Sequence, residues 1–396
     1  MSKPLRVAFF SDSFYELNGV GTVSREFASF AQRAELPFCS IHSGARTCVT
    51  QLDSVTRIEL KRGVTFALDK DLHCDPFLSR YRNWVMEQLR AFRPHLIHIT
   101  GPGDMGVLGF WISNLLGVPM VASWHTNIHE YASRRIYKLL DSVPCMRDGA
   151  AAAVERSCLR ALMAFYRLAH FVLAPNQASV NLLAERTRRP AYPMKHGVDT
   201  ARFCPRPRSA NGDFCIGWVG RLTPEKNVRA FVDLESQLLA AGEPGFRMLL
   251  VGDGSEREWL SKRLHSARLP GFLQGNELAD AFASMDTFVF PSKTDTFGLV
   301  LLEAMASGVP VVLSSEAGAR VGIRDGIEGF LCDNLSEGVL KLMRCNGLRQ
   351  TMSAASEEFA RTQTWNNVFE SLYETYRIAL ATPEVRRRMR CSSIQT

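Results

Sequence analysis

Short apolar runs alternate with helical patterns along the first half of the chain. Four runs predict buried strands, at residues 5–10, 95–99, 118–124 and 171–174. The first run ends in Ser11-Asp12 and the others in glycine, proline or polar residues. Strands that alternate with helices indicate a mostly parallel sheet covered on both faces. Ligands bind at the carboxyl ends of the strands in such sheets.

A second series of the same kind occupies the other half. It predicts strands at residues 214–219, 247–251, 287–290 and 309–313. Between the two series, residues 203–213 contain two prolines and a glycine, which is typical of a linker. Residues 357–380 predict one or two helices, and residues 383–396 predict an irregular basic tail.

The two series predict two doubly wound α/β domains. A length of 396 residues agrees with this, because a single core seldom grows beyond about 250–300 residues. We place the first domain at 1–200 and the second at 201–355. We expect C-terminal helices at 356–382 to pack back on the first domain, with the tail at 383–396.

Composition describes an ordinary globular protein, with 46% hydrophobic and 22% charged residues. No apolar run reaches the roughly 18–20 residues of a membrane-spanning helix. The apolar stretch after Arg6 is too short for the core of a signal peptide. Ten cysteines lie at scattered spacings without a CxxC pair, which predicts reduced, structural thiols. We therefore expect a cytoplasmic protein.

The net charge of +7 is concentrated in the first half of the chain. Residues 1–200 hold 24 Lys and Arg against 17 Asp and Glu, whereas residues 201–396 hold 23 of each. A basic half could face nucleic acid, an anionic membrane or an anionic substrate. The chain shows neither an RNA-binding motif nor an aromatic platform, so we expect no nucleic-acid partner.

The strongest candidate for a binding site runs from Pro291 to Pro310. It comprises a strand end, a polar loop and a helix that starts near Gly298. Backbone N–H groups at a helix start can donate to hydroxyl or phosphate oxygens. The carboxylates of Asp295 and Glu303 can accept hydrogen bonds from a hydroxyl-rich ligand. The alternative is that Asp295 caps the helix and Glu303 is a surface acid.

Two cations follow the strand at 214–219. Arg221 and Lys226 lie in a Gly-Arg…Glu-Lys-Asn loop. Fixed cations there would stabilise the charge of a departing nucleoside diphosphate. No Asp-x-Asp metal motif accompanies the donor segment, so we expect the two side chains to take the place of a metal ion. A surface arginine at a strand end is the alternative for Arg221.

Two further loops of the first domain are candidates. Gly19 and Gly21 would let the backbone approach a diphosphate closely, although an ordinary tight turn explains them equally well. His125 follows the strand at 118–124, and we expect it to bind the donor sugar rather than a metal. His95 and His98 lie inside a predicted strand and are assigned to the core.

The spacing of Asp295 and Glu303 resembles the carboxylate–x7–carboxylate signature of the retaining glycosyltransferase family 4. Further motifs occur in the family's order over most of the chain, at residues 18–21, 125–127, 196–199 with Phe203, 220–227 and 252–254. The first carboxylate is often Glu in the family. Because Asp is one methylene shorter, the loop that carries Asp295 must shift to reach the sugar.

The resemblance implies the GT-B fold, in which two Rossmann-like domains face each other across a cleft. The acceptor would bind mainly to the first domain and the nucleotide to the second. Glu303 would hold the ribose hydroxyls. Asp295 would hold a hydroxyl of the donor sugar, assisted by backbone amides near Phe297, Gly298 and Leu299. The reaction would retain the anomeric configuration by a front-face substitution, without a cofactor other than the donor.

The donor and the acceptor are less closely defined. The motifs favour GDP-mannose, with a UDP-hexose as the alternative, and an acceptor that is a lipid, a saccharide or a small molecule. A sugar-nucleotide epimerase or hydrolase of the same fold, or a non-catalytic sugar-nucleotide-binding protein, would share these motifs. A phosphorylase would need a pyridoxal lysine and a much longer chain.

The segment between Tyr131 and Leu140 is a candidate membrane contact. Arg134, Arg135 and Lys138 recur at helical spacing among apolar residues. A basic amphipathic helix can lie on an anionic membrane, which would suit a lipid acceptor on its inner face. The alternative is a solvated basic face over an ordinary core contact.

Overall fold

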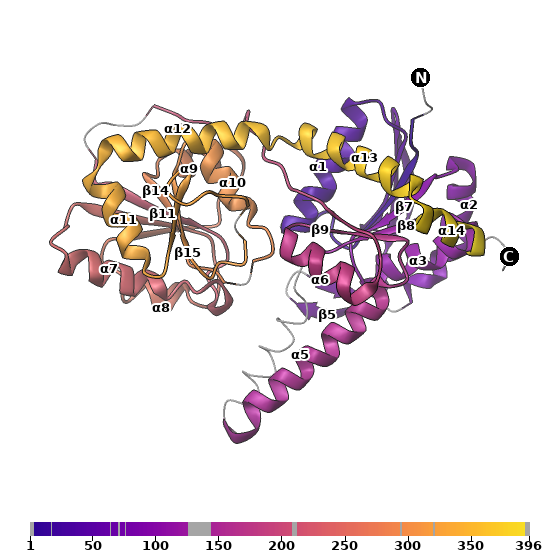
Figure 1. The fold of residues 1–396 in the computed structure, drawn as a ribbon, viewed down its shortest axis with the longest axis horizontal. Coiled ribbons are helices and arrows are strands. Elements are labelled where there is room, and N and C mark those ends of the chain that lie inside the picture. Colours follow the sequence, from indigo (N-terminus) through magenta and orange to yellow (C-terminus); the bar gives the residue numbers. More distant parts are fainter. Residues whose placement is uncertain are drawn as a thin grey trace. The chain divides into compact units, whose positions relative to one another are not determined.

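The chain divides into two compact units (Figure 1). The computed structural model describes residues 4–16, 18–63, 65–69, 72–75, 77–125, 144–207, 212–293, 295–319 and 321–392. The first unit consists of residues 1–195 and 368–396, and the second of residues 196–367. The end of the chain therefore belongs to the same unit as its beginning.

An eight-stranded sheet forms the centre of the first unit. Its order is β10-β9-β8-β7-β1-β2-β4-β3, and neighbouring strands are parallel except β3, which is antiparallel to β4. The strands are β1 (Val7–Ser11), β2 (Phe38–Gly44), β3 (Cys48–Leu52), β4 (Val55–Lys61), β7 (Leu96–Ile99), β8 (Met120–Ser123), β9 (Phe171–Ala174) and β10 (Ala191–Pro193). A separate hairpin comprises β5 (Phe66–Asp69) and β6 (Leu72–Cys74). All residues of β1, β7, β8 and β9 are buried, as expected of a parallel sheet covered on both faces.

Helices complete the first unit. They are α1 (Gly19–Arg33), the 3-10 helix η1 (Leu78–Tyr81), α2 (Arg82–Phe92), α3 (Asp104–Leu116), α5 (Pro144–Tyr166), α6 (Gln177–Thr187), α13 (Trp365–Ala381) and α14 (Pro383–Ser392). Helix α13 begins at the end of the second unit and continues into the first. Its Phe369 stacks on Phe27 of α1 with ring centroids 4.6 Å apart, and both rings are fully buried. This C-terminal helix is thus part of the core of the first unit.

A six-stranded sheet, parallel throughout, forms the centre of the second unit. Its order is β13-β12-β11-β14-β15-β16. The strands are β11 (Phe214–Val219), β12 (Phe246–Val251), β13 (Ala267–Gly271), β14 (Thr287–Phe290), β15 (Val311–Ser314) and β16 (Gly329–Cys332). The helices are η2 (Pro224–Lys226), α7 (Ala230–Ala240), α8 (Arg257–Ser261), α9 (Gly275–Ala283), α10 (Leu299–Ala306), α11 (Leu335–Arg344) and α12 (Asn346–Thr362). In Figure 1 the strands of this unit lie between its helices.

Each of the eight predicted strands overlaps a strand of the structure, whereas β2 to β6, β10, β13 and β16 were not predicted. The strands predicted at residues 171–174, 214–219 and 287–290 coincide with β9, β11 and β14. The prediction of an irregular tail at 383–396 is wrong for its first ten residues, Pro383–Ser392, which form α14. Burial of Val385 explains this helix, because one apolar side chain anchors an otherwise basic segment. No helix among the described residues is long and apolar enough to cross a membrane.

Candidate functional site

The order of strands in the second unit creates a switch point. The chain passes from β11 outward to β12 and β13, then returns to β14 on the other side of β11. Loops after two such strands diverge, and ligands of open α/β sheets bind where they do. Arg221 and Lys226 follow β11, and Asp295 follows β14. The topology therefore gathers residues that the sequence holds far apart.

An ion pair joins the two loops at this point. Lys226 Nζ contacts Asp295 Oδ1, and their side chains are only 13% and 18% exposed. Next to it, Asn227 Nδ2 donates to the Pro291 carbonyl oxygen over 3.3 Å. Asn227 adopts the left-handed conformation that ends η2, with φ of +54°. The loop after β11 is thus fixed against the loop after β14.

Three buried oxygen atoms at the switch point have no hydrogen-bond partner among the described residues. They are Thr223 Oγ1, Ser292 Oγ and Asp295 Oδ2. A buried polar atom without a partner costs about 1–3 kcal/mol. A ligand rich in hydroxyl groups could satisfy them. The sequence analysis gave no role to Thr223 or Ser292, although each lies inside a predicted motif.

Backbone N–H groups at the start of α10 follow Ser292 and Asp295 closely in the sequence. Gly298 precedes the helix with φ of +77°, and no side chain caps the first turn. The amide groups from Leu299 onward carry the positive end of the helix dipole, which favours an anion or a hydroxyl oxygen. Phe297 is buried and packs on His196 with ring centroids 4.2 Å apart. This contact holds the loop in place.

Glu303 lies one turn further along α10. Its side chain is half-buried. A surface acid would be exposed, so this burial favours the alternative in which Glu303 is part of the site. Burial raises the pKa of the Glu303 carboxyl to about 7, and the charge of Arg202 opposes the rise. The group can therefore be protonated near neutral pH and donate as well as accept a hydrogen bond.

Among the residues of the second unit that the sequence places in the site, Arg221 has the most exposed side chain. Its side chain is 45% exposed, and its Nη2 atom lies 3.9 Å from Glu225 Oε1. An ion pair of this length and exposure contributes little, so the guanidinium can turn to an anion. Gly252 explains how the neighbouring loops pack, because a Cβ atom there would collide with the Gly220 carbonyl oxygen.

The sheet of the first unit has its own switch point, between β1 and β7. Asp12 follows β1, and Oδ1 accepts from the backbone N–H groups of Met105 at 3.1 Å and Gly106 at 3.3 Å. Burial, reinforced by the charge of Asp104, raises the pKa of Asp12 to about 7, and the backbone donors oppose this. The sequence marked Asp12 as a strand end and gave it no role.

Gly19 and Gly21 form the first turn of α1. The side chain of Asn18 caps the helix by accepting from the Gly21 N–H at 2.9 Å. A Cβ atom on Gly21 would collide with the Glu16 carbonyl oxygen. Packing alone thus requires a glycine at position 21, which supports the tight-turn alternative for this residue.

His125 lies after β8, and a hydroxyl of that strand holds its ring. Ser123 Oγ is 2.7 Å from His125 Nε2, and burial lowers the pKa of His125 to about 4, so that the ring is neutral near pH 7. His98 is buried in the core as predicted, yet its Nε2 atom lies 2.8 Å from the same hydroxyl. The predicted membrane segment, residues 131–140, lies outside the described residues.

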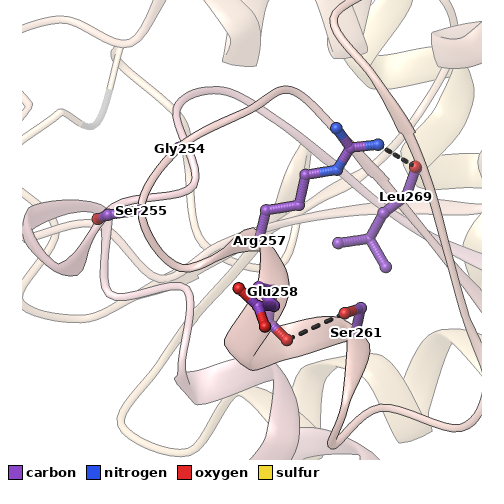
Figure 2. A pocket seen from close by; sticks show the side chains of 6 residues that line it. All are labelled: Gly254, Ser255, Arg257, Glu258, Ser261 and Leu269. Atoms are coloured by element: carbon purple, nitrogen blue, oxygen red, sulfur yellow. Dashed lines mark hydrogen bonds between the residues drawn. The ribbon is translucent and has the colours of Figure 1, made fainter.

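A hollow of 510 Å³ lies beyond the end of β12, beside α8 (Figure 2). Its lining comprises Gly254, Ser255, Arg257, Glu258, Ser261 and Leu269. Arg257 Nη2 donates to the Leu269 carbonyl oxygen over 3.3 Å, which joins two of the lining residues (Figure 2). These six residues include none of the predicted donor-site residues, so the candidate site rests on the switch point instead.

Metal ligands do not cluster in the described part of the chain, where no group of three or more His, Cys, Asp and Glu residues could hold an ion. One Asp-x-Asp sequence does occur, at Asp69-Lys70-Asp71, away from the donor segment. Lys70 and Asp71 lie outside the described residues.

Two family models match the chain. The model for glycosyltransferase family 4 matches residues 17–202, and the model for glycosyl transferases group 1 matches residues 213–344. The chain is 35% identical over 306 residues to a GDP-mannose-dependent alpha-mannosyltransferase of Mycobacterium tuberculosis, covering 74% of this chain and 75% of the relative. It is 26% identical to the enzyme of that name from Corynebacterium glutamicum, covering 96% and 90%.

Solved structures share the fold. Sucrose-phosphate synthase from Thermosynechococcus elongatus superposes with a TM-score of 0.69 at 17% identity, covering 95% of this chain and 99% of the other. Anabaena HepE in complex with UDP-glucose gives a TM-score of 0.64 at 16% identity, covering 94% and 99%. WaaG, a glycosyltransferase of lipopolysaccharide biosynthesis, gives 0.63 at 14% identity, covering 93% and 99%.

Proposed function

Because the chain belongs to glycosyltransferase family 4, we propose that it transfers a mannosyl group from GDP-mannose to a hydroxyl of a lipid, saccharide or small-molecule acceptor. The family and the GT-B fold predicted from the motifs are both confirmed. The chain is therefore a glycosyltransferase that uses a nucleotide-sugar donor. Mannose is supported by the names of the relatives from Mycobacterium tuberculosis and Corynebacterium glutamicum, both GDP-mannose-dependent alpha-mannosyltransferases.

The proposal for the site rests on the contact between Lys226 and Asp295. Two residues predicted from separate motifs are in contact at the switch point, and Asp295 Oδ2 has no partner among the described residues. Asp295 would accept a hydrogen bond from a hydroxyl of the sugar. Lys226 and Arg221 would bind the diphosphate, and Glu303 would bind the ribose. Carboxylates for hydroxyls and cations for phosphates match the two halves of a sugar nucleotide.

The proposed reaction is a front-face substitution that retains the anomeric configuration. The bond between the anomeric carbon and the phosphate oxygen breaks, the bond to the acceptor oxygen forms, and the acceptor proton passes to the leaving phosphate. Arg221 and Lys226 would stabilise the negative charge on the leaving group. The two cations support a reaction without a metal ion, so EDTA should leave the rate unchanged. A covalent glycosyl-enzyme in a mass spectrum would contradict this route.

Donor screening tests the proposal. We expect GDP and GDP-mannose to raise the melting temperature, because a ligand at about 100 times its Kd stabilises a protein by about 2.7 kcal/mol. Product analysis with GDP-mannose should then show a new α-mannoside. Stabilisation by UDP and not by GDP would favour a UDP-hexose. An isomerised or hydrolysed sugar nucleotide would indicate the epimerase or hydrolase, and binding without any product would indicate a non-catalytic protein.

We also propose that the first unit contacts anionic membranes through the segment between Tyr131 and Leu140. Its support is charge: the first unit holds 29 Lys and Arg against 19 Asp and Glu, whereas the second holds 18 against 21. Sedimentation with anionic liposomes should capture the wild type. Combined Arg134→Glu, Arg135→Glu and Lys138→Glu substitutions should release it.

A matched control distinguishes the effect of this segment from the effect of a change in net charge. Lys262, Arg263 and Arg268 are exposed on the second unit, and their substitution by Glu changes the net charge equally. Binding that is unchanged by the first triple variant would remove the membrane proposal. Equal loss in both variants would show a general charge effect.

A further inference from the structure

A line of hydrogen bonds crosses the buried centre of the first unit, from α13 to His125. Tyr376 Oη lies 2.6 Å from His98 Nδ1, and His98 Nε2 lies 2.8 Å from Ser123 Oγ. Ser123 Oγ in turn lies 2.7 Å from His125 Nε2. Tyr376, His98 and Ser123 are at most 1% exposed. A helix from the end of the chain is thus connected to a residue at the carboxyl edge of the sheet.

The Tyr376 hydroxyl determines which atom is the donor in each hydrogen bond of this line. Burial lowers the pKa values of His98 and His125, so each neutral ring has one N–H and one lone pair. Among the described residues, His98 Nδ1 is the one hydrogen-bond partner of Tyr376 Oη. If the hydroxyl did not donate to it, a buried O–H would lack an acceptor. Tyr376 therefore donates, and His98 carries its proton on Nε2.

The Ser123 hydroxyl accepts one hydrogen bond of this line and donates the next. Its hydroxyl accepts from the His98 N–H and can donate either to His125 Nε2 at 2.7 Å or to the Ile99 carbonyl oxygen at 3.3 Å. The shorter distance is that of an ordinary O–H hydrogen bond, whereas the longer one is weak. Ser123 therefore donates to His125 Nε2, which must hold the lone pair of the ring.

We propose that Tyr376, His98 and Ser123 are positioning residues that hold His125 as a neutral imidazole with its proton on Nδ1. In this tautomer His125 carries its N–H at Nδ1, and the orientation of the ring is set from Nε2. The consequence for catalysis rests on the proposed function and on the expectation from the sequence that His125 binds the donor sugar. The assignment of the tautomer does not.

Histidine NMR on the full-length protein tests the assignment. In protein labelled with ¹⁵N-histidine, long-range ¹H–¹⁵N spectra distinguish the two tautomers, and His125→Gln identifies the signals of His125. We expect the wild type to show protonation at Nδ1. Tyr376→Phe removes the hydroxyl that fixes the direction, so the second tautomer of His125 should appear. Mannosyl transfer should fall about threefold to tenfold in kcat/KM, the range of one hydrogen bond.

Tyr373→Phe is the matched control. Tyr373 is buried on the same helix, and its hydroxyl has no partner among the described residues. This variant should keep the wild-type His125 spectrum and the wild-type kcat/KM.

Three results would overturn the proposal. They are protonation of His125 at Nε2 in the wild type, an unchanged His125 spectrum in Tyr376→Phe, and unchanged transfer in a variant whose tautomer has shifted. If the wild type transfers no sugar from any donor, the proposed function fails, and the spectra still decide whether Tyr376 sets the tautomer of His125.

Discussion

At the scale of single residues, Asp295 combines two tasks. One carboxylate oxygen contacts Lys226, and the other is buried without a partner in the described part of the chain. A residue that we propose to bind the sugar, and that contacts the lysine proposed to bind phosphate, should be sensitive to any change.

Asp295→Ala should abolish transfer and preserve the fold. The substitution removes the hydroxyl acceptor and leaves Lys226 without its partner, at a stability cost of about 1 kcal/mol. Product formation and the thermal midpoint measure the two effects separately. Asp233→Ala, at an exposed position on α7, is the control and should change neither. Transfer by Asp295→Ala near the wild-type rate would mean that the sugar is held elsewhere.

Glu303 should make stability depend on pH. Its pKa is raised to about 7, above the ordinary value of 4.5, so between these values the folded state binds a proton that the unfolded state has lost. Stability therefore falls as pH rises from about 4.5 to about 7, by about 1–3 kcal/mol from this group. Urea unfolding should show a smaller fall in Glu303→Gln. Asp12, whose pKa is also raised to about 7, keeps part of the dependence. An equal fall in both proteins would contradict the assignment.

At the scale of elements, the start of α10 depends on one glycine. Gly298 has φ of +77°, and a Cβ atom there would lie 3.1 Å from Leu301 Cδ1 and 3.2 Å from Ala319 Cβ. The backbone conformation therefore disfavours a side chain, and the packing leaves little room for one. The amides that we propose to assist the donor sugar are held in place by this turn.

Gly298→Ala should destabilise the second unit by about 1–2 kcal/mol and weaken binding of the donor. Gly347, on α12, is the matched control, because a Cβ atom there meets nothing within 4 Å and its φ is not in the left-handed region. Gly347→Ala should stabilise by about 0.5–1 kcal/mol and leave donor affinity unchanged. Urea unfolding and donor titration measure both variants. Equal stability changes of the two would contradict the role of Gly298.

At the scale of the whole molecule, the first unit is closed by the last part of the chain. Phe369 and Tyr376 are fully buried in it, against Phe27 and His98. The core of the second unit, by contrast, extends no further than Ala360. The aromatic cluster that contains Phe27 and Phe369 is therefore complete only with α13, whereas the core cluster from Ala8 to Leu183 contains no residue of this helix.

Deleting residues 368–396 should unfold the first unit and spare the second. Each buried aromatic ring is worth about 3–5 kcal/mol, and several are lost together, which approaches the whole stability of a typical domain. Calorimetry should retain the transition of the second unit, and proteolysis should cut the first. Deleting residues 393–396 alone should change neither. Protection of the first unit in the longer deletion would contradict this dependence.

The sequence by itself determined the fold class and eight of the strands, and it predicted residues of the candidate site. Buried parallel strands read as uninterrupted apolar runs, so β9, β11 and β14 could be located to the residue. The motifs that contain Arg221, Lys226 and Asp295 can also be recognised locally, because their glycines and charged residues lie in the loop that directly follows a predicted strand.

Only the tertiary structure decided which of these residues meet. The contact between Lys226 and Asp295 spans 69 positions and follows from strand order, which no local pattern encodes. Burial of Glu303, and the link from Tyr376 to His125, likewise depend on packing between distant segments. His98 looked like any core histidine, because a hydrogen-bond partner 278 positions away leaves no trace in the neighbouring sequence.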